Sequence, residues 1–285
     1  MTSMRDIKQR IENVRSTEQI IRAMDMVAST KLQKARRQLE GVRPMYHELK
    51  RVVEEIGNKE EVEDHPFYFE RKVKNSLYIV LTSDRGLSGS YNVNVLAHSL
   101  KHMNEGKNEK ILVVGSKGNE YFKKRNKNII RKITNIADAR VYYGTENLAE
   151  WVSELYLSGE VEEVYIAYTR FENVLSYTPQ VERLLPVATG VELEGFENSD
   201  EKKYEPNLAT FIDHVMPLYL HMSLFRAFSE AHTSEQAARM VNMDAAGKNA
   251  SDLIKDLTSM YNRKRQAAIT QELSEIVGSA NFLSK

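Results

Sequence analysis

The first 57 residues carry one stripe of apolar side chains, spaced alternately four and three residues apart. Its positions are Ile7, Ile11, Val14, Glu18, Ile21, Asp25, Ala28, Leu32, Ala35, Leu39, Val42, Tyr46, Leu49, Val53 and Ile56. Only Glu18 and Asp25 interrupt the stripe when Ala and Tyr count as apolar. A repeat of about 3.5 residues over this length predicts the seam of a coiled coil, because the apolar stripe of an ordinary surface helix follows a period of about 3.6.

Glycine and proline mark the limits of this helix. Gly57 follows the last apolar position and is a natural stop signal. A helix of that extent would be about 75 Å long at 1.5 Å per residue. Pro44 lies inside it and is expected to bend or loosen the helix near Gly41, since proline cannot donate the backbone hydrogen bond.

The middle of the chain has a different pattern, in which short apolar runs alternate with helical stretches. Strands are expected at 76–83, 110–116, 128–133 and 161–171, with a last, proline-bearing edge strand or extension at 176–188. Helices are expected at 91–105, 118–126 and 145–159. This alternation predicts a small α/β domain of the Rossmann-like kind with a mainly parallel sheet.

From residue 207 to 283 the pattern is helical again, with Pro217 as an early kink. One apolar stripe runs through Leu208, Ile212, Val215, Tyr219, Met222, Phe225 and Phe228. The following segment, SEQAARMVNMDAAGKNA, is rich in Ala and Gly, whose small side chains let a partner helix approach closely. It can also be a weakly packed surface helix.

The two terminal helices are expected to pair as an antiparallel coiled coil, with the α/β domain inserted between them. The predicted domains are therefore a shaft of 1–57 and 207–285 and an α/β domain of 75–190, joined by loops at 58–74 and 191–206. If Leu208 packs near Ile56, the second helix outlasts the first by roughly 258–283, which is nearly 40 Å at about 1.5 Å per residue.

The apolar pattern changes phase where this overhang begins. One expected face contains Ala250, Leu253, Leu257 and Met260, and a second contains Ile269, Leu273, Ile276, Ala280 and Leu283. Nine residues at about 100° each place the second face opposite the first. A lone amphipathic helix is marginal in water, so the overhang implies an external partner.

Composition excludes several classes of protein. The chain has no cysteine, which rules out disulfides and thiolate chemistry and fits a reducing compartment. Forty basic residues balance forty acidic ones, which argues against general nucleic-acid binding. The N-terminal residues do not resemble a signal peptide, and no apolar run is long enough to span a membrane.

Three short motifs have both a functional and a structural interpretation. TSDRGLSGS (82–90) suggests a phosphate loop but lacks the spacing of known ones, so a tight turn capped by Asp84, with Arg85 projecting, is favoured. His98 and His102 have metal-ligand spacing but no third ligand nearby, which favours a solvated helix face. The basic run at 263–265 fits a partner contact better than a nucleic-acid site. No motif indicates a catalytic group.

Several long motifs resemble the gamma subunit of the F-type ATP synthase. They are MRDIKQRIENVRSTEQIIRAMDMVASTKLQKAR, TSDRGLSGSYN, YEPNLATFIDHVMPLYL, SEQAARMVNM and YNRKRQAAITQELSEIVGSA. The resemblance covers the whole chain and is weakest from about 100 to 200. It departs at AAGKNA, where Gly247 is expected to loosen the shaft, and at the ending SANFLSK.

The resemblance implies a non-catalytic rotor shaft, present once per complex, that transmits torque between a membrane rotor ring and a ring of alpha and beta subunits. It also implies an epsilon subunit as partner, no nucleic acid, and a peripheral location on the cytoplasmic face of the inner membrane. ATP, ADP and Mg²⁺ would be bound by the partner subunits and no cofactor or metal by this chain. A coiled-coil scaffold with an α/β head and a nucleotide-binding enzyme are the alternatives.

Residue roles follow from the same resemblance. The expected contacts with beta subunits are Met24, Asp84, Arg85, Ser88, Arg239, Arg265, Gln266 and Thr270. Weaker candidates for the contact with the rotor ring and epsilon are Arg43, Tyr46, Tyr204 and Glu205. Ile269, Leu273 and Ile276 are expected to face an apolar sleeve made by other subunits.

Overall fold

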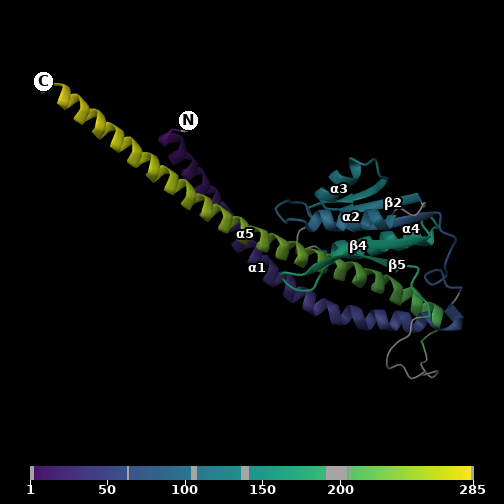
Figure 1. Ribbon diagram of the computed structural model, residues 1–285. Helices are drawn as coiled ribbons and strands as arrows, with labels where there is room; N and C mark the ends of the chain where they lie inside the picture. The colour runs from purple at the N-terminus through teal and green to yellow at the C-terminus, as the bar shows by residue number, and fades with distance from the viewer. Residues whose placement is uncertain are drawn as a thin grey trace. The chain divides into compact units, whose positions relative to one another are not determined.

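The computed structural model describes residues 3–62, 64–103, 108–135, 141–190, 204–205 and 207–283, with side chains up to residue 277. Internal contacts divide the chain into two compact units. Unit 1 contains Met1–Ser29 and Met240–Lys285, and unit 2 contains Thr30–Arg239. Each of the two long terminal helices contributes to both units (Figure 1).

The first of these helices, α1 (Met4–Gly57), follows the predicted stripe. All fifteen stripe positions are buried or half-buried, whereas most of the positions between them are exposed. The helix continues through Pro44 and ends at Gly57. A β-carbon at Gly57 would lie 2.9 Å from the ring of Tyr68, whose hydroxyl donates to the Val53 carbonyl oxygen at 2.9 Å. Glycine therefore permits the close contact that fixes the end of α1.

The second long helix, α5 (Leu208–Leu283), packs against α1 within each unit. In unit 1, Ile7 and Ile11 are buried with Leu257, and Ile254 and Tyr261 lie against them. The predicted stripe positions Leu253 and Met260 are instead 40% and 44% exposed. That part of the prediction was wrong because the buried positions here run through 254, 257 and 261, a different face of the helix.

In unit 2, α1 and α5 make a second set of contacts. Val42 is buried with Met222 and Phe225, and the rings of Tyr46 and Tyr219 stack at a centroid distance of 6.4 Å. A later residue of α1 thus contacts an earlier residue of α5, as in two helices that run in opposite directions. The predicted antiparallel pairing is confirmed.

The predicted α/β domain contains a five-stranded sheet. Its strands are β1 (Asn75–Leu81), β2 (Asn108–Val114), β3 (Ile129–Ile133), β4 (Glu163–Phe171) and β5 (Tyr177–Leu185). The strand order is β3-β2-β1-β4-β5. Only β5 runs antiparallel, on the edge next to β4, where Pro179 needs no ladder donor. The remaining pairs are parallel, as the alternating pattern predicted.

Helices cover both faces of this sheet. The elements are η1 (Glu60–Val62), α2 (Tyr91–Met103), α3 (Ser116–Lys123) and α4 (Val141–Leu157). Buried residues of α2 and α3 pack against Tyr78 and Val80 on one face. Buried residues of α4 and α5 pack against Leu77 and Ile79 on the other, because successive side chains of a strand point to opposite faces. The expected loop at 191–206 lies almost entirely outside the described residues.

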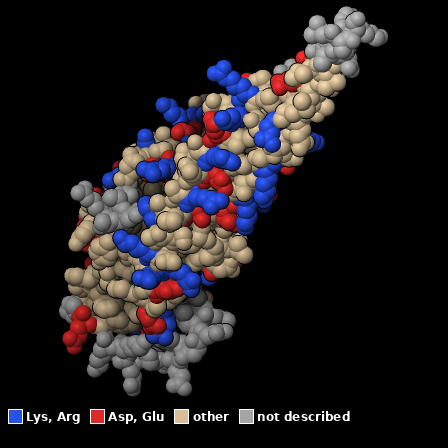
Figure 2. Space-filling view, turned by 90° about the vertical axis from the view of Figure 1, so that its left-hand side faces the viewer, with Lys and Arg blue, Asp and Glu red and all other residues tan. Residues whose placement is uncertain are grey.

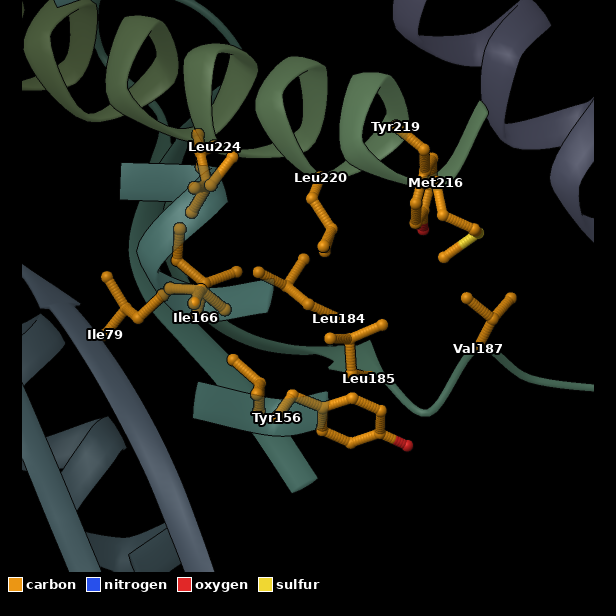
Figure 3. Packing of buried hydrophobic residues seen from close by; sticks show 14 of the residues in the cluster. Ile79, Tyr156, Ile166, Leu184, Leu185, Val187, Met216, Tyr219, Leu220 and Leu224 are labelled. Atoms are coloured by element: carbon orange, nitrogen blue, oxygen red, sulfur yellow. The ribbon is translucent and has the colours of Figure 1, made fainter. Parts of the chain in front are cut away.

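The core of unit 2 lies between α5 and the sheet. Figure 3 shows Leu220 and Leu224 of α5 pointing toward Ile166 and Leu184, with Tyr156 of α4 beyond them. These labelled side chains are almost inaccessible to solvent. The inner part of α5 is therefore part of the core of the α/β domain as well as a partner of α1.

Charges of both signs are distributed over the surface. Lys and Arg side chains lie among Asp and Glu side chains on the face shown in Figure 2. This agrees with a formal net charge of zero and gives that face no separate basic field for a nucleic acid.

Truncating a seam residue tests the packing of α1. Leu39 is 1% exposed, so Leu39→Ala should lower the free energy of unfolding by about 2–5 kcal/mol through lost burial and a cavity. Arg37→Ala, on the exposed side of the same turn, is the control and should have little effect. Thermal or denaturant unfolding measures both. Equal stability of the two variants would contradict the seam.

Candidate functional site

The turn after β1 contains the predicted contact residues Asp84, Arg85 and Ser88. The Asp84 carboxylate accepts hydrogen bonds from the backbone nitrogen and the hydroxyl of Ser116, both at 2.9 Å. Its other oxygen accepts from the backbone nitrogen of Asn135 at 2.8 Å. Asp84 therefore joins the end of β1 to the first turn of α3 and to the segment after β3, which satisfies backbone donors that a helix start leaves open.

The rest of this turn is held by serine and asparagine side chains. Asn92 accepts from the Ser83 backbone nitrogen at 2.9 Å and donates to the Ser83 hydroxyl at 2.7 Å. Ser88 is 2% exposed. The residues that point outward are Arg85 and Leu87, of which Leu87 is 60% exposed.

Leu87 lies inside the turn from Asp84 to Ser88 that the family resemblance gave as a contact, but it was not among the residues named there. Its φ is 67°, a left-handed conformation that costs a leucine about 1–2 kcal/mol. A large apolar side chain that is both strained and exposed has a poor structural explanation. Residue type alone gives no sign of a positive φ at a leucine, so only the structure identifies this position.

A cavity of about 130 Å³ lies beside the turn, at the carboxyl ends of β1 and β2. Several of its polar groups already have partners within unit 2. The Tyr91 hydroxyl donates to the Ala231 carbonyl oxygen at 3.0 Å, the Ser229 hydroxyl donates to the Phe225 carbonyl oxygen at 2.8 Å, and Glu235 pairs with Arg239. These groups and Asp84 are thus occupied within the fold, and the basic side chains of Lys31, Lys34 and His232 also line the cavity.

Arg239 links α5 to the same turn. Its guanidinium donates to Glu235 at 2.5 Å and to the Gly86 carbonyl oxygen at 3.4 Å. The structure thus brings Arg239 to the turn that contains Asp84, Arg85 and Ser88, more than 150 residues away in sequence. Met24 belongs to unit 1 and is half-buried on α1.

The four weaker candidates for the contact with the rotor ring and epsilon fall into two pairs. Arg43 and Tyr46 are turned inward, Arg43 toward Glu230 at 2.8 Å and Tyr46, 5% exposed, toward Tyr219. Tyr204 is half-buried, with the Lys59 ammonium 4.8 Å from its ring centroid, and Glu205 is exposed. The outward geometry favours a partner contact for the second pair over the first.

The predicted tip residues lie on α5 in unit 1. Arg265, Gln266 and Thr270 are exposed, and the Thr270 hydroxyl donates to the Gln266 carbonyl oxygen at 2.9 Å. The apolar residues of the tip are also exposed, Ile269 by 47%, Leu273 by 57% and Ile276 by 62%. The side chains of Ala280 and Leu283 lie outside the described residues.

The predicted solvated face is confirmed for His98 but was wrong for His102, which is half-buried against two tyrosines. His102 lies 2.9 Å from the Tyr78 hydroxyl, and its ring is 4.8 Å from that of Tyr165, whereas His98 is exposed. Among the residues that the structure describes there is no group of three metal-ligating side chains. The same residues include no helix long and apolar enough to cross a bilayer.

Comparison with known proteins decides the family. The family model described as ATP synthase matches residues 3–283. The ATP synthase gamma chain of Desulforamulus reducens is 39% identical over 99% of this chain and 100% of its own length. The sodium ion specific gamma chain of Acetobacterium woodii is 36% identical over 99% of both chains. The chain belongs to the ATP synthase gamma chain family.

Solved structures agree with this assignment. A chain of the central stalk and c-ring of the Tetrahymena thermophila mitochondrial ATP synthase is 25% identical, with a TM-score of 0.65 over 80% of this chain and 99% of that one. A chain of the Euglena gracilis mitochondrial ATP synthase, 19% identical, has a TM-score of 0.69 over 98% and 94% of the two chains and supports the fold. As a gamma chain, this protein is a non-catalytic subunit.

The Asp84 network can be tested by removing its carboxylate. Asp84→Ala leaves the open donors of Ser116 and Asn135 without their acceptor and should cost about 0.5–2 kcal/mol of unfolding free energy. Arg85→Ala, on the outward side of the same turn, should change stability far less. Denaturant unfolding measures both, and an unaffected Asp84→Ala would show that the turn does not depend on this cap.

Proposed function

We propose that this chain is the central rotor shaft of a proton- or sodium-translocating ATP synthase. It transmits torque between a membrane rotor ring and a catalytic ring of alpha and beta subunits, and thereby regulates ATPase activity and ion flow. One copy serves each complex, with an epsilon subunit beside the α/β domain, peripheral to the cytoplasmic face of the inner membrane. The nucleotides and Mg²⁺ belong to the partner subunits.

The observation that carries this proposal is the exposed apolar side of α5 beyond its last described contact with α1. In unit 1, Ile7 packs with Leu257, and Tyr261 is the last α5 residue of that cluster. The helix continues to Leu283, which is about 33 Å further at 1.5 Å per residue. Its large apolar side chains that the structure describes are roughly half exposed or more, namely Ile269, Leu273, Ile276 and Val277. An isolated helix of this kind is marginal in water, so a bearing made by other subunits explains both its length and its apolar stripe.

Rotation inside a ring requires contacts that form and break. A shaft that presents one side at a time stabilises one conformation of each surrounding subunit in turn, which is coupling through differential contact energy. The proposed beta-facing contacts are Met24, Arg239, Arg265, Gln266 and Thr270 together with the turn of Asp84, Arg85 and Ser88. Within that turn Arg85 and Leu87 make the contact, because Asp84 and Ser88 hold its shape.

We propose that the α/β domain rests on the rotor ring and receives torque from it. The similar Tetrahymena chain belongs to an assembly of a central stalk and a c-ring, which supports this placement. Tyr204 and Glu205 are the proposed contacts on this chain. Arg43 and Tyr46 are weaker candidates, because both are turned inward.

Two substitutions on the tip test the contact with beta subunits. A hydrogen bond to a charged group contributes about 1.5–3 kcal/mol, so Gln266→Ala with Thr270→Ala should slow ATP hydrolysis and rotation of the reconstituted ring about tenfold or more. Gln271→Ala with Glu275→Ala removes a comparable exposed pair, 3.0 Å apart, from another side of the same helix and is the matched control. Unchanged rates in the first variant would remove Gln266 and Thr270 from the mechanism.

A substitution at Leu87 can distinguish a loss of partner binding from a loss of stability. Leu87→Gly relieves the positive φ and should keep or raise the stability of this chain, by up to about 1 kcal/mol, while weakening its binding to the alpha–beta ring. Leu175→Gly removes another leucine side chain, 82% exposed, from the β4–β5 connection and should leave ring binding unchanged. Titration of the ring with each purified variant measures the affinity. Wild-type affinity in Leu87→Gly would mean that this leucine does not face a partner.

A further inference from the structure

A charged side chain of α5 is buried against the sheet in unit 2. Arg226 is 5% exposed, and its guanidinium donates to the Tyr168 hydroxyl of β4 at 2.6 Å and to Glu182 of β5 at 2.5 Å. The Tyr168 hydroxyl also donates to Glu182. On the opposite side, the guanidinium carbon lies 4.2 Å from the ring centroid of Tyr46 on α1. One arginine thus touches two strands and the partner helix.

A second buried charge follows one turn later on the same face of α5. The Glu230 side chain is 2% exposed, and its carboxylate receives two hydrogen bonds from Arg43 of α1, both at 2.8 Å. It also accepts from the backbone nitrogen of Phe171, the last residue of β4, at 2.8 Å. Arg43 in turn donates to the carbonyl oxygen of Phe171. Again one side chain of α5 joins the sheet and α1.

Stability alone does not account for these two charges. Replacing a buried ion pair by apolar residues of similar size is often neutral or stabilising, because burial removes both charges from water. The surrounding interface is already apolar, as Leu220 and Leu224 show (Figure 3). The arrangement nevertheless leaves the Arg226 Nε without a hydrogen-bond partner. An interface that required only stability would therefore gain little from these two ion pairs.

Directional bonds supply what apolar packing lacks. Hydrophobic contact is non-directional and depends mainly on the apolar area removed from water. Bidentate bonds of a guanidinium hold both distance and angle. The order of charges adds to this: shifting α5 by one turn would place Glu230 beside Glu182, and like charges in contact oppose such a slip.

We propose that Arg226 with Glu182 and Tyr168, and Glu230 with Arg43 and Phe171, are two clamps that hold the sheet to the α1–α5 pair against twisting. The proposal rests on the proposed function, since it assigns the place within this chain where torque passes between sheet and helices. These are positioning residues, which contact neither nucleotide nor any reacting atom.

The test replaces one clamp by apolar groups so that the fold is kept and the directional bonds are lost. The variant is Arg226→Met with Glu182→Leu and Tyr168→Phe. Because the chain has no cysteine, Lys124→Cys on the exposed end of α3 takes a single bead or fluorophore. In the assembled complex with an immobilised alpha–beta ring, angular fluctuations of this probe between steps give the torsional stiffness.

We expect the stiffness to fall by up to about twofold, because one of the two clamps is removed while the apolar core remains, with fewer ions pumped per ATP hydrolysed and a melting temperature near that of the wild type. The control is Arg183→Met with Glu70→Leu, which removes an exposed pair 2.9 Å apart that also involves β5 and should leave stiffness unchanged. Arg226→Lys keeps the positive charge but loses the planar guanidinium that donates to two partners, so the torsional stiffness should be lower than in the wild type. This variant provides the test if the triple variant does not assemble.

The outcomes separate this inference from the proposed function. If the probe rotates on the wild-type complex but both clamp variants are as stiff and as well coupled as wild type, the clamps carry no torque and the inference is overturned. If the probe on the wild-type complex does not rotate during hydrolysis, the proposed function itself fails. Softening in the exposed-pair control equal to that in the clamp variants would also overturn the assignment.

Discussion

The antiparallel seam between α1 and α5 determines most of what the rest of the chain does. Its spacing of four and three residues buries one side of α1 over almost its whole length. Residues early in α1 contact residues late in α5, and residues late in α1 contact residues early in α5. Because α1 has 54 residues and α5 has 76, the shorter helix must run out first. The exposed apolar tip is the geometric result of that difference.

The seam is not uniform, and its weakest part lies in unit 1. There Gly247 offers no side chain to Ile21, whose nearest atom would be 3.7 Å from a β-carbon at that glycine. A cavity of about 250 Å³ follows, lined by Ile21, Asp25 and Gly247 among others. One Asp25 oxygen is buried without a hydrogen-bond partner. This open, polar-lined hollow leaves the seam less closely packed beside Gly247, where the family resemblance led us to expect a looser shaft.

The sequence was most informative where structure follows from local periodicity. The stripe of α1, the end at Gly57 and the alternation of strands and helices all depend on neighbours a few residues away, and all were found. What failed or was missed depends on distant partners. The pairing of Arg43 with Glu230 spans 187 residues, and the buried face near Leu257 is displaced from the predicted one. A capping role was expected for Asp84, but not its distant partners Ser116 and Asn135. No spacing rule encodes such contacts.

Within the proposed rotor, the polar interactions that must persist during rotation differ in burial from those that must form and break. The Arg226 and Glu230 side chains are buried and their partners Arg43 and Glu182 about one third exposed, so a lowered dielectric strengthens their bonds. Gln266 and Thr270 are exposed, where water exchanges with a partner at little net cost. The apolar stripe of Ile269, Leu273 and Ile276 lacks direction and so allows turning. Burial thus separates the groups that would keep the shaft rigid from those that would let it rotate.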